Sequence, residues 1–224
     1  MSTPYFTPEL FKFLRELKRN NNREWFLANK TRYETQVRDP FLRFISDLGP
    51  RLASISNRFV ADPRPSRGSL FRIYRDVRFS ADKSPYKTHV AARFPHRDAG
   101  KKIHVPGFYL GLEPGKSFAA AGCWHPDPLT LRKIRDGIIR RPDAWKEIHR
   151  RQIPVEGDVL SRAPRGYPTE HPLIKDIRRK DFITCVDFTD SQVCGTRFLE
   201  DFVYACRNMS PLVEFLTRAL ALRW

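Results

Sequence analysis

Hydrophobic residues change their spacing twice along this chain, and that change limits the folds open to it. From Leu10 and Phe13 to Phe44 and Leu48 they recur every three or four residues, as on one face of a helix. Over about 69–125 they alternate, as in strands, and the helical spacing then returns. This order predicts an α+β fold: a mainly antiparallel central sheet with N-terminal and C-terminal helices packed on it.

The length of 224 residues suits a single domain made of these three parts. We expect N-terminal helices over 1–50, an antiparallel meander over 69–125, and a helical region with one further strand, at Phe182 to Phe188, over 128–224. Proline interrupts helices because it lacks a backbone N–H. We therefore expect Pro40 to kink the second helix, Gly49-Pro50 to end it, and Ser210-Pro211 to separate two closing helices.

The most unusual stretch is SLFRIYRDVRFSADKSPYKTHV, which covers positions 69–90. Its alternation predicts a strand with Phe71, Ile73, Val77 and Phe79 on the core face. The opposite face of the meander is predicted to present Arg72, Tyr74, Asp76, Arg78, His89, Arg93, Tyr109 and Glu113. Between these large side chains, room would be left by Ala91, Gly111, Ala119 and Ala121. A sheet face of this composition suggests the floor of a groove, although half-exposed antiparallel sheets also have ordinary solvated faces.

Arg75 falls on the apolar face of the predicted strand, where an unpaired guanidinium would cost several kcal/mol. One interpretation is a structural ion pair with a carboxylate on a helix. The other is a β-bulge that turns the side chain toward the groove, since bulges often redirect side chains beside sites. The sequence leaves both open.

We predict an anion-binding groove for phosphate or a nucleotide on this sheet face, because arginine, lysine and tyrosine bind planar anions and stack on rings. The predicted ligand-binding residues are Arg72, Tyr74, Arg75, Arg78, Lys83, Tyr86, Lys87, Arg93 and Tyr109. Asp76 and His89 are the candidates for proton transfer, the catalytic role if the protein is an enzyme. Whether there is catalysis stays open, and the sequence assigns no cofactor and no metal site.

The net charge of +16 favours an anionic partner. The alternative function is therefore a nucleic-acid-binding module that uses an overall basic surface. A pure interaction protein is a third class, and it would require an exposed apolar patch. The four cysteines have no C-x-x-C spacing, and no apolar run is long enough for a membrane span. These features predict a cytoplasmic protein without a transmembrane segment.

Four blocks carry a family resemblance: FLRELKRNNNREWF, SLFRIYRDVRFSADKSPYKTH, PGFYLGLEPG followed by AAAGCW, and GYPTEHPLIKDIRRKDF. In this order they resemble the signature blocks of a microbial family, domain of unknown function 2461. The resemblance spans nearly the whole chain. It implies a single α+β domain in the cytoplasm, and it implies no catalytic residues.

Overall fold

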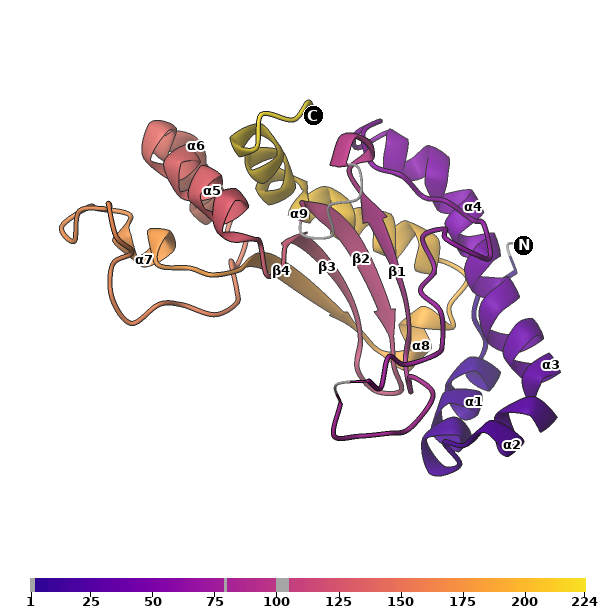
Figure 1. The fold of residues 1–224 in the computed structure, drawn as a ribbon. Coiled ribbons are helices and arrows are strands. Elements are labelled where there is room, and N and C mark those ends of the chain that lie inside the picture. The colour runs from indigo at the N-terminus through magenta and orange to yellow at the C-terminus, as the bar shows by residue number, and fades with distance from the viewer. Residues whose placement is uncertain (1–2, 79, 100–104) are drawn as a thin grey trace.

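A four-stranded antiparallel sheet lies at the centre of the protein, with its strands in the order β1-β2-β3-β4 (Figure 1). This computed structural model describes residues 3–78, 80–99 and 105–224. The strands are β1 (Val90–Pro95), β2 (Gly107–Leu112), β3 (Ser117–Cys123) and β4 (Phe182–Phe188). Each strand pairs with the next, so the last three strands of the predicted meander and the late strand are confirmed.

Helices flank the sheet and cover one of its faces, while the face toward the viewer in Figure 1 carries no helix. This arrangement confirms the predicted α+β fold. The N-terminal elements are α1 (Pro8–Arg19), α2 (Arg23–Ala28), α3 (Lys30–Tyr33), the π-helical turn η1 (Glu34–Arg38) and α4 (Asp39–Ala53). The later ones are the 3-10 turn η2 (Arg97–Ala99), α5 (Pro128–Arg140), α6 (Pro142–Arg150), α7 (Ile174–Ile177), α8 (Asp190–Val193) and α9 (Phe198–Ala219).

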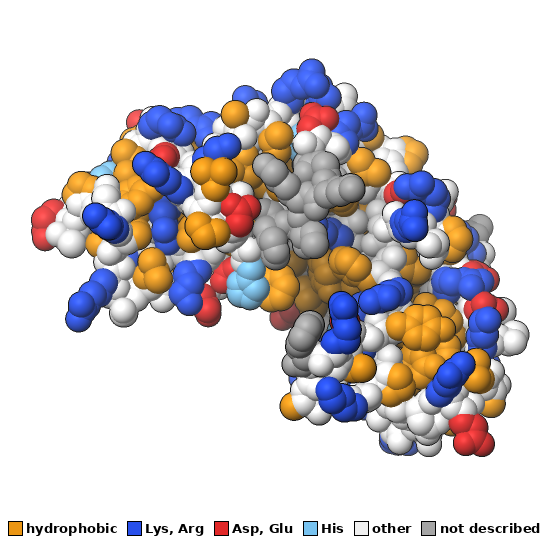
Figure 2. Space-filling model, viewed as in Figure 1, with side chains coloured by type: hydrophobic (Ala, Val, Ile, Leu, Met, Phe, Trp, Pro, Cys, Tyr) orange, Lys and Arg blue, Asp and Glu red, His pale blue; other side chains and the backbone are white. Residues whose placement is uncertain are grey.

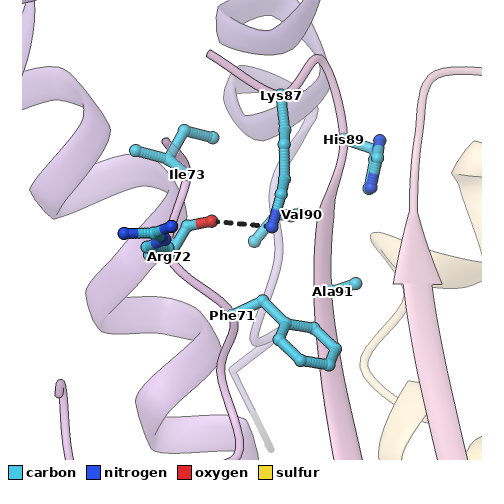
Figure 3. Close-up of a pocket in the computed structure, with 7 residues that line it drawn as sticks. All are labelled: Phe71, Arg72, Ile73, Lys87, His89, Val90 and Ala91. Carbon is cyan, nitrogen blue, oxygen red and sulfur yellow. Dashed lines mark hydrogen bonds between the residues drawn. The ribbon is translucent and has the colours of Figure 1, made fainter. Parts of the chain in front are cut away.

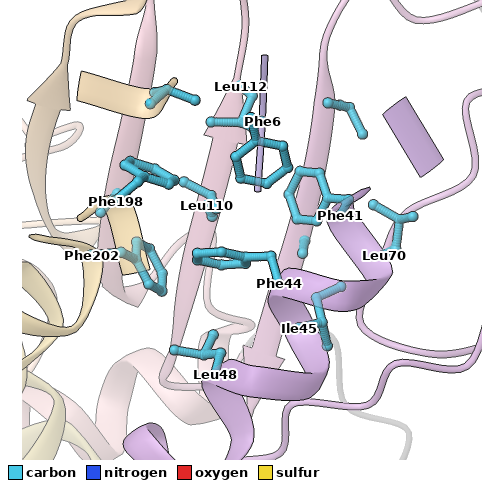
Figure 4. Packing of buried hydrophobic residues seen from close by; sticks show 14 of the residues in the cluster. Phe6, Phe41, Phe44, Ile45, Leu48, Leu70, Leu110, Leu112, Phe198 and Phe202 are labelled. Atoms are coloured by element: carbon cyan, nitrogen blue, oxygen red, sulfur yellow. The ribbon is translucent and has the colours of Figure 1, made fainter. Parts of the chain in front are cut away.

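Phenylalanine rings build the larger of two buried clusters, between the sheet, α4 and α9 (Figure 4). Phe44 of α4 lies at its centre, with ring centroids 5.5 Å from Phe6, 5.7 Å from Phe198 and 5.6 Å from Phe202. Leu110 of β2 closes the cluster from the sheet. Burial of such rings is the main source of stability, and these contacts join segments from both ends of the chain.

A smaller buried cluster lies where α5 and α6 meet β4 and the second half of α9. Its centre is Trp145, with ring centroids 5.8 Å from Phe182 and 4.9 Å from Phe215. Helix α9 therefore contributes to both clusters. The expected break at Ser210-Pro211 is wrong, because α9 continues through Pro211 with buried residues on either side of it.

Helix α4 bears on two further expectations about proline. Pro40 lies in the first turn of α4, just after the π-helical turn, where its missing N–H is tolerated, and the kink expected there stays a prediction. Gly49-Pro50 does not end the helix, which runs to Ala53 and buries Leu52 completely. Packing of the apolar face against the core outweighs the local preference of these residues.

The predicted strand at 71–79 is wrong for its described residues, which form an irregular hairpin with 84–87. A few backbone bonds hold it: Phe71 N–H donates to Ala91 (2.9 Å), and Lys87 N–H donates to Ile73 (2.8 Å). Isolated bridges replace a continuous ladder. Ile73 is buried as expected, Phe71 is 43% exposed, and Phe79 lies outside the described residues.

Ala119 and Ala121 lie on the core face of β3, not under the open face as expected. They pair with Leu110 and Phe108, and all four are buried in the larger cluster. The strand begins at Ser117, and its open-face positions are therefore Phe118 and the small residue Ala120.

Candidate functional site

The face of the sheet that has no helix on it forms the candidate site. In the view of Figure 2, the molecular surface is hollowed between the lobe of α5, α6 and α7 and the lobe of α1, α2 and α3. Lysine and arginine side chains gather along the rim of this hollow. A concave surface with a basic rim is suited to an anionic ligand.

A row of aromatic rings crosses this open face. The ring centroids of Phe71 and Tyr109 are 6.3 Å apart, and those of Tyr109 and Phe118 are 5.5 Å apart and stacked. Gly111 leaves space for the last two, since a Cβ there would lie 3.0 Å from both rings. Tyr109 is largely buried, and burial raises its pKa. Aromatic rows of this kind stack bases and other planar rings.

A small pocket opens beside this row, between the 71–73 segment and the residues that lead into β1 (Figure 3). Its lining combines a ring, cations and an imidazole: Phe71, Arg72, Ile73, Lys87, His89, Val90 and Ala91. The Lys87 ammonium donates to the Arg72 carbonyl (3.0 Å) and lies 5.4 Å from the centre of the Phe71 ring. Burial and the nearby Arg72 guanidinium lower the pKa of Lys87.

Arg72, Lys87 and Arg93 share one property: no carboxylate of the described residues forms an ion pair with them. Arg93 projects from β1 and donates to the Val105 carbonyl (2.8 Å), and burial lowers its pKa. Lys87 and Arg93 are partly desolvated, and cations in such surroundings interact strongly with an incoming anion.

The remaining predicted cations belong to the exposed hairpin 75–84 and are bonded within it. Arg75 pairs with Asp82 and also donates to Ser84 Oγ (2.7 Å). Its carboxylate partner therefore lies in the same hairpin, so Arg75 is not a staple to a helix. Lys83 donates to the Val77 carbonyl (3.1 Å).

Asp76 and Arg78, on the same hairpin, form a two-pronged pair with distances of 3.0 and 2.7 Å. The Arg78 side chain and backbone N–H lower the pKa of Asp76 to about 2. Such a carboxylate is a weak proton acceptor at neutral pH, so the geometry gives no support to the predicted proton-transfer role of Asp76.

His89 is the other predicted proton-transfer residue, and it lines the pocket. Burial lowers its pKa, and the Lys87 and Arg75 charges act in the same direction, while the Glu113 carboxylate opposes them. The imidazole is therefore mainly neutral at pH 7 and can accept a proton or a hydrogen bond.

The two predicted tyrosines of the hairpin have different surroundings. Tyr86 is buried and stacks on Phe26, with ring centroids 4.1 Å apart, and Asn21 bonds both its N–H (3.0 Å) and its carbonyl (2.9 Å). Tyr86 therefore anchors the hairpin to α2. Tyr74 is half exposed and rests against Tyr86.

A polar pair that was not predicted from the sequence lies at the far end of the sheet. His125, just after β3, bonds to the buried carboxylate of Asp181, which directly precedes β4. The partners are 56 residues apart in sequence, and no local motif links them. Strand pairing is the signal that could have revealed this pair. Cys123, the last residue of β3, pairs with Phe182, the first residue of β4, and this brings His125 and Asp181 together.

Other kinds of site find less support. No group of three or more metal-ligating side chains occurs among residues 3–78, 80–99 and 105–224. A second hollow between α4 and α9 carries charges of both signs: Arg51, Arg197, Glu200, Asp201 and Arg207. Within the described parts of the chain, no helix has both the length and the apolar character needed to cross a bilayer.

Comparison with known proteins gives a family. No curated protein matches the sequence. The sequence model of a family described as "Conserved hypothetical protein (DUF2461)" matches residues 9–215, which is most of the chain. The signature blocks noted above lie within or across this range, and the protein belongs to the DUF2461 family.

Proposed function

We propose that the open face of the sheet binds a phosphorylated ligand that carries a ring, of the nucleotide class. The observation that carries this proposal is Lys87: a half-buried ammonium group that has a carbonyl and an aromatic ring as neighbours but, among the described residues, no carboxylate in an ion pair with it. A phosphate is the counter-ion such a group lacks.

Arg72 and Arg93 extend the cationic surface on either side of Lys87. Arg72 lines the same pocket. Arg93 lies two residues after Ala91 along β1, where it pairs with Tyr109. Phosphate oxygens can accept from several N–H donors at once, and a guanidinium offers two in one plane. The phosphate would therefore lie between Arg72 and Lys87, with Arg93 reaching a second charged group.

The rings of Phe71, Tyr109 and Phe118 supply the second half of the proposed site. They lie on the same face as the cations and offer a stacking surface for a base. His89 is the proton acceptor of this pocket, since burial keeps it neutral at pH 7.

Isothermal titration calorimetry with ATP, pyrophosphate and adenosine tests the proposal. We expect ATP to bind more tightly than either fragment, because it alone uses both halves of the site. Each charge-assisted hydrogen bond is worth about 1.5–3 kcal/mol, so Lys87→Ala should weaken ATP binding by about tenfold or more.

Arg64→Ala is the matched control, because it removes the same charge from an exposed side chain already paired with Asp62 (2.6 Å). It should leave ATP binding nearly unchanged. Equal losses in the Lys87 and Arg64 variants would show that only net charge matters and would reject the site.

A nucleic-acid-binding function is the second candidate, favoured by the length of the aromatic row together with the net charge of +16. Single-stranded nucleic acids bind by stacking on such rows beside cationic grooves. Filter binding of a single-stranded RNA 12-mer at several salt concentrations would show a steep salt dependence, with a slope of about −0.7 per phosphate contact. A flat response would remove this candidate.

A further inference from the structure

His125 and Asp181 form a carboxylate–imidazole pair at the end of the sheet opposite to Lys87. Asp181 is 2% exposed, and its carboxylate oxygen Oδ1 accepts from the His125 backbone N–H (2.6 Å) and lies 3.0 Å from His125 Nδ1. It also accepts from the Asp158 N–H (3.2 Å). The His125 side chain is 54% exposed. A buried carboxylate thus holds one edge of a ring whose other edge faces outward.

Three features of the neighbouring structure restrict the position of the His125–Asp181 pair. Gly157 has a φ of +111°, and a methyl group at that position would overlap Asp181. His125 has a φ of +47°, which costs free energy for a residue with a side chain. Trp124 stacks on the imidazole with ring centroids 4.2 Å apart. Strained backbone persists only where the surrounding contacts maintain it, and it is common at functional sites.

The nearby carboxylate favours one of the two imidazole tautomers. An Asp181 oxygen 3.0 Å from Nδ1 favours a hydrogen on that nitrogen, which leaves the lone pair of the neutral ring on Nε2. Among the described residues, Nε2 has no hydrogen-bond partner. This is the arrangement of an imidazole general base, in which a carboxylate orients the ring and stabilises its protonated form.

We propose that His125 Nε2 is a proton acceptor for a hydroxyl-bearing ligand or a water bound at this end of the sheet, and that Asp181 is its positioning residue. In the step, the O–H bond breaks, the proton moves to Nε2, and the electron pair stays on oxygen. The positive imidazolium then lies beside the Asp181 carboxylate, with Nδ1 3.0 Å from Oδ1. The proposal is independent of phosphate binding at Lys87, because the two groups lie at opposite ends of the strands.

Modification by diethyl pyrocarbonate tests the proposal, because this reagent reacts with unprotonated imidazole nitrogen. Rates at individual histidines are followed by peptide mass spectrometry between pH 5.5 and 8. We expect His125 to react readily and Asp181→Asn to slow its reaction by about tenfold. His149 is an internal control, since its Nε2 is occupied by Asp176 (3.1 Å) and its rate should be the same in both proteins.

Long-range 1H–15N NMR of the unmodified protein gives a second measurement that does not require a variant to fold. The expected signal at neutral pH is an Nδ1–H tautomer for His125 with an unprotonated Nε2. An Nε2–H tautomer, or a His125 that does not react in the native protein, would overturn the proposal. An unchanged His125 rate and pH profile in a folded Asp181→Asn variant would also overturn it.

Discussion

The two ends of the open sheet face each present a histidine, and the two are held in opposite ways. His89 precedes β1 beside Lys87 in a partly desolvated pocket, and no carboxylate in the described part of the chain is bonded to it. His125 follows β3, stays half exposed, and is tied to the buried Asp181. At the first end the environment sets the protonation state, and at the second a specific partner sets the orientation.

The neighbouring backbone shows the same contrast. The hairpin beside His89 is rich in charge, but its Arg75 and Arg78 are bonded to carboxylates of the same hairpin. The turn beside His125 has few charges, yet glycine packing and a left-handed residue fix it. A dense run of charged residues in the sequence is therefore a poorer indication of a rigid site than one pair of residues, distant in sequence, that the fold brings together.

The largest effect that would test this contrast is expected from Gly157→Ala. The new methyl group meets Asp181, and a φ of +111° is strained for alanine, so the free energy of unfolding should fall by about 2–4 kcal/mol. Urea denaturation measures it. Gly166→Ala is the control: its φ is +88° but nothing lies near, so only strain of about 1 kcal/mol is expected. Equal losses would mean that the turn around Asp181 is not tightly packed.

An intermediate effect is expected from His89→Gln, seen as a change in pH dependence. The folded-state pKa of His89 is lower than its ordinary value of 6.5, mainly because of burial. The unfolded chain therefore binds the proton more readily, and stability falls as the pH drops below about 6.5. Thermal midpoints at pH 7.5 and 5 should differ less in the variant than in the native protein. The same difference in both would show that His89 is not desolvated.

The smallest effect is expected from Asp82→Ala in the exposed hairpin. Asp82 pairs with Arg75 and accepts from the Ser84 N–H, and these bonds, the backbone bond first, lower its pKa to about 2. The pair stabilises the fold above pH 3.8, and this contribution is lost as the pH falls toward 2. Because the pair is exposed, the thermal midpoint at pH 7 should change little. A large decrease would show that the hairpin is as firmly fixed as the turn at His125.

Much of the fold could be predicted from the sequence, because alternation in β1, β2 and β3 follows from their buried face. The 71–79 segment alternates in the same way but makes only isolated bridges. Alternation shows which side chains can share a face, and it does not show that a neighbouring strand is present. The helix breaks predicted at Pro50 and Pro211 are wrong for a related reason. Residues on both sides of each proline are buried, and this packing outweighs the local preference of proline to interrupt a helix.

The candidate site was predictable only where it is local in sequence. Arg72, Lys87 and His89 lie within one short stretch, and the strand pattern placed Arg93 and Tyr109 on the same face. Which cations have their own carboxylates was not predictable, because Arg75 and Arg93 look alike in sequence. The His125–Asp181 pair depends on the register of β3 against β4, which a single sequence does not reveal.

Helix α9 has a consequence for how a ligand is accepted. Its 22 residues span about 33 Å; α4 packs on its first half at Phe202, and α6 packs on its second half at Phe215. We therefore expect the hollow over the open sheet face to keep a constant width and not to close around a bound ligand. Ligands would then be selected by their fit to the open site as it stands, and a bound ligand would exchange rapidly with solvent.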